Sequence, residues 1–478
     1  MKKIVGFLKI TVFILLSTSV LSSCFLIKKK GEGVSTTTGM AYGDSNDTLR
    51  FTPFDTKNLP NPPGMLFIQG GRTVLGSFEE DLFGSRDNIE RTVTVNSFYM
   101  DETEVTNKDW KEYVKYQFNP IVEGIGDDYD VADDPNNPFL SATKSHNGLE
   151  LTDLVPNDSV WQSDFSFNDV YSENYYSNPG YNNYPVVGVT WRQVVDYAKW
   201  RTDAVNYNII NQLEFEDLPD EYKLEFYNPD GTLQVLGGDG GGGNTSADGV
   251  VQLTLQEIDD LQQDQIAFIN SNKKKFIERG LYLPEFRLPN EAEWEYAAKA
   301  TVGTQYLDEN EEYGRIYPWD GRGVRNPYGK ERGSMLANFK RGRGDYAGIA
   351  GSVNNDGDVI PRAVGGYDPN DFGLYNMAGN VSEWVNDTYR PLSFQDFDDL
   401  NPVRKDGTGD PEELYGFGEN RNDFRSLIND RAKVYKGGSW KDVAYWMSPG
   451  TRRFLDQDKG TNTLGFRCAM ISIGFVEK

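Results

Sequence analysis

Short apolar runs bounded by glycine, proline and polar residues recur along the chain, and they predict a framework of short β-strands. Residues 64–68, Gly-Met-Leu-Phe-Ile, and residues 92–95, Thr-Val-Thr-Val, have the length and the β-branched or aromatic content of strands. Residues 98–107 continue as an extended segment that leads into a helix, for which Thr106 is a good N-cap. Residues 184–191 predict a further strand and turn. The pattern therefore favours strands mixed with helices.

A spacing of three to four residues between apolar positions predicts two more helices. On the helix that follows residue 191, the apolar side consists of Val194, Val195, Ala198 and Trp200. Core packing explains this side without any cofactor. The other helix opens near Glu291, and both Glu291 and Glu293 lie in its first turn. Negative side chains are favoured at a helix N-terminus, so we do not interpret these two as an acid/base pair.

Three polar segments interrupt this framework, at about residues 118–183, 202–282 and 390–430. The second contains a glycine run at residues 237–243, which is typical of a flexible loop and lacks the Lys-Ser/Thr of a phosphate-binding loop. Surface loops often carry specific contacts, so the three inserts are candidates for partner binding. We expect one domain over residues 63–472 that contains all three inserts.

The first residues have the pattern of a bacterial lipoprotein signal. A basic start and a mostly apolar run precede Leu-Ser-Ser-Cys at residues 21–24. We expect a signal peptide over residues 1–23, a lipid on Cys24 and a flexible tether over residues 24–62. Phe25, rather than Asp, follows the cysteine. This favours attachment to the outer membrane, with the domain facing the periplasm.

Composition narrows the possible functions. The formal net charge of −25 over 478 residues argues against binding to nucleic acid, and is compatible with divalent cations or a basic partner surface. If Cys24 is lipidated, Cys468 is the remaining thiol, so no disulfide framework is expected. Cys468 alternates with apolar residues and is expected to be a buried structural residue. His146 is the one histidine, in a polar insert, so no catalytic triad can be built without it.

Five blocks rich in glycine, tryptophan and arginine occur at residues 287–298, 372–385, 435–440, 451–453 and 465–467. Together they resemble the formylglycine-generating-enzyme (sulfatase-modifying factor) family, and the resemblance extends from about Gly64 to Met470. It implies an α+β fold, the formylglycine-generating-enzyme-like variant of the C-type-lectin-like fold. It also implies much irregular structure and large loop insertions.

This chain lacks the reactive residues that the chemistry of the resembled family needs. The resembled enzymes oxidise a substrate cysteine with copper held by two cysteines, and by spacing those positions fall on Asp442 and Met447. A soft cuprous site needs thiolates, which these residues do not supply. A sister activity, an iron-dependent sulfoxide synthase, needs several histidines. We therefore expect no catalytic residue, no catalytic cofactor and no enzyme activity.

The resemblance also implies structural calcium in two loops. The ligands carried over are Asn338, Phe339, Asp356 and Asp358 in the first loop and Asn380, Val381 and Glu383 in the second. Amide and carboxylate oxygens, with backbone carbonyls from Phe339, Asp358 and Val381, would give the hard oxygen ligands that calcium prefers. The alternative is that Asn380 and Glu383 only form hydrogen bonds within the turn before Trp384.

Three arginines near the C-terminus are also candidates for a defined role. Arg452, Arg453 and Arg467 are expected to form buried ion pairs that hold loops together. The alternative concerns Arg453, which would line the former substrate groove and bind a carboxylate there.

A narrower resemblance involves residues 98–107, 185–193, 337–346 and 446–453. These segments are similar to the gliding-motility lipoproteins of the Bacteroidota, of the GldJ or the paralogous GldK type. The resemblance implies a non-catalytic scaffold in the gliding and type IX secretion machinery, with other subunits of that machinery as partners. It leaves open whether the chain forms homo- or hetero-oligomers.

Two other functions remain as alternatives at this point. One is a calcium-dependent binder of glycans or peptidoglycan that uses surface aromatic residues. The other is an oxidase of the formylglycine-generating class, which the lack of paired cysteines and of several histidines disfavours. The sequence does not identify the direct partner or the stoichiometry.

Overall fold

The computed structural model describes residues 35, 37–42, 61–76, 84, 87–118, 154–163, 166–213, 218, 220–226, 255–301, 315–319, 321, 323–330, 332–346, 359–389, 399–403 and 431–473. Contacts divide the chain into two compact units, and the larger comprises Pro60–Ile277 and Leu281–Glu477. In the smaller unit, backbone hydrogen bonds from Gly39 to Ser35 (2.9 Å) and from Ser35 to Met40 (2.8 Å) close a turn. The signal peptide, Cys24 and most of the predicted tether lie outside the described residues.

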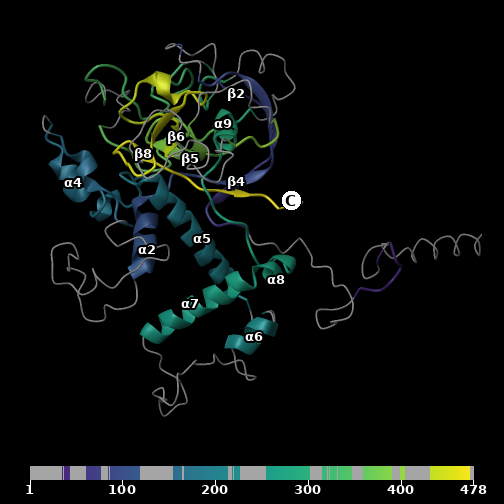
Figure 1. Ribbon diagram of the computed structural model, residues 1–478. Coiled ribbons are helices and arrows are strands. Elements are labelled where there is room, and N and C mark those ends of the chain that lie inside the picture. The colour runs from purple at the N-terminus through teal and green to yellow at the C-terminus, as the bar shows by residue number, and fades with distance from the viewer. Residues whose placement is uncertain are drawn as a thin grey trace, which may run out of the picture. The chain divides into compact units, whose positions relative to one another are not determined.

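Two small sheets form one part of the larger unit (Figure 1). β4 (Phe98–Asp101) lies between β1 (Met65–Ile68) and β9 (Ala469–Ile471), and both pairings are antiparallel. β2 (Gly71–Leu75) pairs with β3 (Arg91–Val95), also antiparallel. β1 and β3 confirm two strands predicted from the sequence. Because β9 pairs with β4, the C-terminal end of the domain is joined to its N-terminal strands.

A third sheet of four strands carries most of the candidate site. Its order is β7-β6-β5-β8, formed by Arg453–Asp456, Ala432–Lys436, Ser382–Thr388 and Leu464–Gly465. β5 pairs antiparallel with β6 and parallel with β8. Tyr435 on β6 lies opposite Trp384 on one side and Arg453 on the other. The sheet therefore brings together residues from four of the five sequence blocks.

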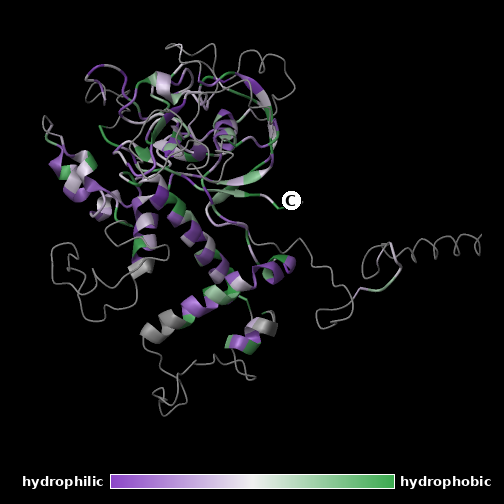
Figure 2. Cartoon of the chain, viewed as in Figure 1, coloured by the Kyte–Doolittle hydropathy of each residue, from purple (hydrophilic) through white to green (hydrophobic). Residues whose placement is uncertain are grey.

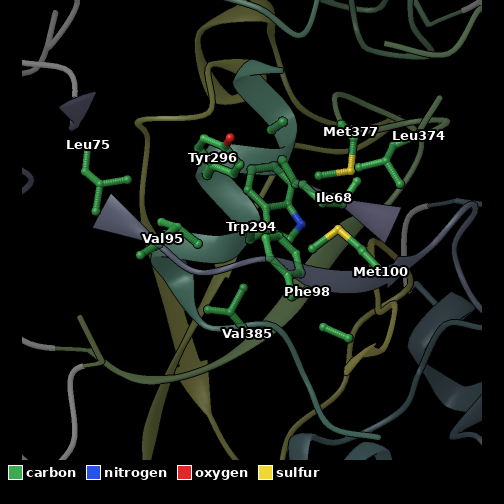
Figure 3. Close-up of a cluster of buried hydrophobic side chains, with 14 of the residues drawn as sticks. Ile68, Leu75, Val95, Phe98, Met100, Trp294, Tyr296, Leu374, Met377 and Val385 are labelled. Carbon is green, nitrogen blue, oxygen red and sulfur yellow. The ribbon is translucent and has the colours of Figure 1, made fainter. Parts of the chain in front are cut away.

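α9 (Glu291–Lys299) lies in the core, and all nine of its residues are buried. Its start is fixed by the Glu293 side chain, which accepts the backbone N–H of Asn290 at 2.8 Å. Trp294 is fully buried and belongs to a cluster with Phe98 and residues of the neighbouring strands. Figure 3 shows the Trp294 indole among these side chains. The predicted helix start is confirmed, and Ala292, Trp294 and Tyr296 of the helix belong to the hydrophobic core.

α2 (Asn107–Phe118) and α5 (Trp191–Asn211) form a second core next to the sheets. Thr190 caps α5, because its side chain and that of Gln193 bond reciprocally to the backbone. The ring of Trp110 stacks on that of Tyr197 at 5.4 Å between centroids. The predicted apolar side of α5 thus packs against the helix that begins after Thr106.

The insert predicted at residues 202–282 is more helical than its polar composition suggests. α5 continues to Asn211, and the insert also contains α6 (Asp220–Phe226), α7 (Leu255–Ser271) and α8 (Lys273–Glu278). Widely spaced apolar residues on this segment form a separate cluster: Ile210, Leu218, Tyr222, Phe226, Ile269, Phe276 and Tyr282. Figure 2 shows hydrophilic and hydrophobic residues mixed along α5 and α7. Across the described residues, none of the helices has the length and apolar character needed to span a membrane.

The described part of the first insert is built from short helical turns. These are η3 (Asp158–Trp161), α4 (Asp169–Asn174) and η4 (Pro179–Tyr181). Trp161 stacks on Trp440, with 6.0 Å between ring centroids and 21° between planes. The insert is therefore packed onto the loop that follows β6. In the third insert, the described residues are 399–403.

The strand predicted at residues 184–191 is absent from the described structure. A single isolated bridge joins Thr106 and Pro185. The backbone N–H of Val186 donates to Val105, while that of Gly188 donates to Thr461, which lies on a different segment. Because successive residues pair with different partners, no ladder forms and the prediction was wrong.

Candidate functional site

Two left-handed glycines shape the loop before the predicted cysteine positions. Gly437 and Gly438 have φ values of 92° and 67°, a region that favours glycine. A Cβ on Gly437 would lie 3.0 Å from the ring of Trp294, and one on Gly438 would lie 2.9 Å from the backbone of Trp446. The loop can therefore pass close to α9 on its way to Asp442 only because glycines occupy both positions.

Asp442, the first predicted cysteine position, is part of an ion pair. Its two carboxylate oxygens each accept a hydrogen bond from Arg453, at 2.7 Å. The hydroxyl of Ser439 donates to the same carboxylate at 2.5 Å, and Arg453 also donates to Ser382 at 3.0 Å. Arg453 therefore holds a carboxylate that belongs to the chain itself.

Aromatic rings fix the Arg453 guanidinium in this position. Its central carbon lies 4.9 Å from the ring centroid of Tyr435 and 4.7 Å from that of Trp446. Cations are attracted to the faces of such rings. With its hydrogen bonds to Asp442, the guanidinium is restrained from three sides, so we interpret this pair as a structural link between β7 and the loop after β6.

Met447, the second predicted cysteine position, is fully buried at the end of η6 (Ala444–Met447). Its neighbours are apolar: Tyr317, Met335, Ala337, Phe339 and Ala378. The two positions thus supply an ion-paired carboxylate and a thioether packed in a hydrophobic cluster. This set of donors does not fit the soft cuprous ion that two thiolates would bind.

A second ion pair lies deeper in the domain. Arg467 donates to both oxygens of Glu383 at 2.7 Å, and the Trp294 indole N–H donates to the same carboxylate at 2.7 Å. The guanidinium also donates to the backbone carbonyls of Asp101 (3.1 Å) and Tyr375 (2.8 Å). Burial alone would lower the pKa of Arg467, but Glu383 raises it above its usual value. The side chain therefore stays charged and joins β5, β4 and the segment before β9.

Glu104 extends this buried polar cluster. One carboxylate oxygen accepts from the Asn376 amide and the other from the Asn380 amide, both at 2.9 Å. Burial raises the pKa of Glu104 to about 7, against the effect of Arg467 and together with that of Glu383. The sequence analysis missed Glu104, because no local pattern marks a carboxyl whose partners lie far along the chain.

The structure brings together part of the predicted calcium ligands. Asn338, Phe339, Asn380, Val381 and Glu383 are all buried. The Asn380 side-chain oxygen accepts the backbone N–H of Arg362 at 2.7 Å, and both oxygens of Glu383 accept N–H groups. These two side chains therefore fit N–H donors rather than a calcium ion. Asp356 and Asp358 lie outside the described residues.

Metal ligation finds no other support in the described part of the chain. There, no group of three or more His, Cys, Asp or Glu side chains is arranged to hold a metal ion. Cys24 and His146 lie outside the described residues. Calcium binding by the loops at residues 338–358 and 380–383 stays a prediction.

The N-terminal half of α9 carries a third buried charge network. Glu295 pairs with Lys436 at 3.0 Å and with Lys299 at 2.9 Å, and Glu291 pairs with Arg452 at 2.6 Å. Burial raises the pKa of Glu295, but Lys436 and Lys299 outweigh it and lower the pKa to about 2. The prediction that Arg452 and the other two C-terminal arginines form ion pairs is confirmed.

Cys468 is buried and is not in a disulfide. Its backbone N–H donates to the Asp101 carboxylate at 2.8 Å. Burial, reinforced by Asp101, raises the pKa of the Cys468 thiol to about 12. Since the thiolate is the nucleophile, this thiol is poorly suited to catalysis. The prediction of a buried cysteine is confirmed.

Comparison with known proteins gives a family match over most of the chain. The family model described as "Sulfatase-modifying factor enzyme 1-like domain" matches residues 50–471. The chain is 30% identical over 186 residues to the formylglycine-generating enzyme of Streptomyces coelicolor, covering 38% of this chain and 46% of that protein. It is 28% identical over 189 residues to the inactive C-alpha-formylglycine-generating enzyme 2 of Mus musculus, covering 38% and 42%. These alignments span less than half of each relative.

Solved structures that match the chain include PvdO from Pseudomonas aeruginosa, at 14% identity and a TM-score of 0.41. That alignment covers 85% of this chain and 94% of that one. Treponema denticola variable protein 1 matches at 17% identity with a TM-score of 0.37, covering 85% and 95%. The family match, with the mixture of helices, short sheets and irregular segments, confirms the predicted α+β fold of the formylglycine-generating-enzyme type.

Proposed function

Because the chain belongs to the family of sulfatase-modifying factor enzyme 1-like domains, we propose that it uses this fold as a non-catalytic scaffold. In this proposal it is an outer-membrane lipoprotein, anchored through Cys24 and facing the periplasm. It acts as a structural component of the gliding-motility and type IX secretion machinery, of the GldJ or GldK type. Other subunits of that machinery are its partners.

The observation that carries the non-catalytic proposal is the Asp442–Arg453 pair. Asp442 lies where spacing places the first copper-binding cysteine, and both of its oxygens are held at 2.7 Å by Arg453. Met447 at the second position is fully buried. Cys468, the thiol in the described residues, has a pKa raised by burial to about 12. None of these groups supplies a reactive thiolate pair.

The proposed scaffold role draws support from the way the core is held together. Two ion pairs with buried side chains, Glu291–Arg452 and Glu383–Arg467, join segments that are distant in the sequence, and a third, Asp442–Arg453, joins a loop to the neighbouring strand. Removing one partner of such a pair is strongly destabilising, which favours a single well-defined arrangement of the loops. Helices in the insert at residues 202–282 add a structured surface outside this core. A rigid core that presents extra surfaces suits docking better than turnover.

The experiment that tests the proposal has two measurements. Affinity-tagged full-length lipoprotein is purified from mildly solubilised envelopes, and the co-purifying proteins are identified by mass spectrometry. In parallel, the purified chain is incubated with cuprous ion, oxygen and a cysteine-containing sulfatase peptide, with the Streptomyces coelicolor relative as positive control. We expect stoichiometric recovery of gliding or type IX secretion subunits and no conversion of the peptide cysteine. Recovery of the lipoprotein alone, or formation of formylglycine, would overturn the proposal.

A further inference from the structure

One segment of this strongly acidic chain has the opposite charge. Residues 322–346 contain seven Lys or Arg and two Asp or Glu, whereas the whole chain has a formal net charge of −25. The segment lies between α9 and β5 and is separate from the three predicted inserts. Most of it is described, as residues 323–330 and 332–346.

The first half of this segment is a hairpin anchored in the core. An isolated antiparallel bridge joins Arg325 and Met335, and the backbone N–H of Leu336 donates to Val324 at 3.1 Å. Met335 is buried and Val324 partly buried in the cluster that contains Met447. The base of the hairpin is therefore positioned by packing, and Lys330 and Arg332 at its tip are exposed.

The second half is a tight turn beside the candidate site. Gly342 and Asp345 form an antiparallel bridge, and the backbone N–H of Lys340 donates to the Asp442 carbonyl at 2.9 Å. This places the turn next to the loop after β6, where Lys441 is exposed. Lys340 and Lys441 also flank a pair of packed rings, those of Tyr346 and Trp440. The turn and the loop therefore form one continuous surface.

We use the term basic face for six cationic residues on the hairpin, the turn and the adjoining loop. They are Arg325, Lys330, Arg332, Lys340, Arg343 and Lys441. All are exposed except Lys340, which is half-buried. The described carboxylates nearby are already paired, Asp345 with Arg341 and Asp442 with Arg453. Among the described residues, none of these six cations forms an ion pair with a carboxylate, so this part of the chain does not neutralise their charge.

Apolar groups lie among these charges. Tyr328, at the tip of the hairpin, is 78% exposed, and Val443 beside Lys441 is 42% exposed. The side chain of Tyr328 is not needed for the turn, because the contact there is a hydrogen bond from its backbone N–H to Asn326 at 2.9 Å. Tyrosine and arginine are among the residues most enriched where binding energy concentrates in protein interfaces. An exposed tyrosine between Arg325 and Lys330 along the hairpin therefore gives this segment the composition of a protein-binding surface.

We propose that the basic face binds an acidic peptide segment of a protein partner, with the exposed Tyr328 as an apolar contact. The inference rests on the proposed scaffold function and specifies the chemistry of one partner. Charge complementarity favours an acidic segment, and steers its association. An apolar contact favours a peptide with both acidic and apolar side chains over a nucleic acid or a purely anionic glycan. The ring of Trp446 is covered by Arg453 and that of Trp440 packs on Trp161, so stacking of a sugar finds less support.

The test measures binding of a fluorescent peptide to the full-length lipoprotein in detergent. The peptide alternates Asp or Glu with Leu, and its matched analogue has Asn and Gln in place of the acids. Neutralising Lys330 and Arg332 together (K330Q/R332Q) should weaken binding of the acidic peptide at least about fivefold. The matched control, K108Q/K199Q, removes two exposed charges on α2 and α5 and should change binding less than about twofold.

A substitution of Tyr328 distinguishes specific binding of a peptide from general electrostatic attraction to anions. Tyr328→Ala should weaken peptide binding while leaving binding of heparin and of anionic vesicles unchanged, and Phe167→Ala, at an 84% exposed aromatic, is its control. All five proteins are checked for unchanged thermal melting. Equal binding of the peptide and its neutral analogue, or loss of heparin and peptide binding together in Tyr328→Ala, would overturn the proposal.

Purification of the same variants from envelopes distinguishes this inference from the scaffold function. If the wild type recovers partner subunits and K330Q/R332Q loses one of them, the scaffold function and the basic face proposal both stand. If K330Q/R332Q recovers the same set with the same stoichiometry, the basic face proposal fails and the scaffold function stands. If the wild type recovers no subunit, the scaffold function fails whatever the peptide measurement gives.

Discussion

The Asp442 carboxylate accepts two hydrogen bonds from the Arg453 guanidinium, each 2.7 Å long, across eleven residues of sequence. Asp442 lies in the loop after β6, and Arg453 opens β7, the neighbouring strand. The pair therefore closes the loop onto the sheet at the position where spacing places a cysteine in the resembled enzymes. At this position the chain has a structural contact and no reactive group.

The Asp442–Arg453 pair should contribute measurably to stability. Asp442→Asn keeps the shape of the side chain but removes its charge, and should lower the free energy of unfolding by about 1–3 kcal/mol. Arg453→Met should lower the free energy of unfolding by a similar amount. The double variant should lower it by less than the sum of the two single variants. Urea denaturation of all four proteins completes the cycle. Strict additivity would show that the two side chains do not act as a pair.

Glu383 should stabilise the protein through its ion pair with Arg467 and not by binding calcium. Both side chains are buried, at 1% and 0% exposure, so Glu383→Gln leaves a buried guanidinium without its counter-charge. The expected loss is about 3–5 kcal/mol, the usual cost of breaking a buried pair. Thermal melting is measured with calcium and with a chelator, and the loss should be equal in both. A larger loss in calcium would instead identify Glu383 as a ligand.

The Cys468 thiol should be unreactive in the folded protein. Its pKa is raised by burial to about 12, so very little thiolate forms at pH 8, and the buried sulfur is also shielded from reagents. Labelling with a maleimide should be slow in the native chain and fast in urea, with the site read by mass spectrometry. Cys468→Ser is the control that assigns the label. Rapid native labelling at this residue would contradict the burial described here.

Glu295 should contribute to acid sensitivity. Its pKa falls from about 4.3 in an unfolded chain to about 2 in the folded one, where Lys436 and Lys299 outweigh the effect of burial. A depressed pKa contributes stability that is present above about pH 4.5 and is lost as the pH falls towards 2. Urea denaturation at pH 3, 4 and 5 should therefore show a smaller pH dependence in Glu295→Gln than in the wild type.

The matched control for Glu295 is Glu173→Gln, at an exposed residue of α4. This variant should keep the full pH dependence of the wild type. If Glu295→Gln and Glu173→Gln show the same slope between pH 3 and 5, the lysine pairs do not hold the Glu295 carboxyl in its charged form.

The sequence by itself determined the local elements and one important absence. Apolar runs, helical spacing and the favourable charge of Glu291 and Glu293 at a helix N-terminus act within a few residues, so β1, β3, α5 and α9 could be predicted from the printed chain. The motif blocks gave the family, and the printed chain has Asp442 and Met447, not cysteines, at the two positions that spacing assigns to the copper ligands of the resembled enzymes. These conclusions need no knowledge of which segments meet.

The tertiary structure decided which charged side chains meet. With 48 cations and 73 anions in the sequence, nothing local pairs Arg467 with Glu383, 84 residues away, or brings Glu104 to Asn380, 276 residues away. Ion pairs depend on distance in space, and that distance is fixed by strand pairing and by packing around α9. The same reason explains the helices of the insert at residues 202–282, whose scattered apolar residues form a core only once the helices pack. It also explains the missing strand at residues 184–191, because extended residues form a strand only when one neighbouring segment supplies a continuous set of partners.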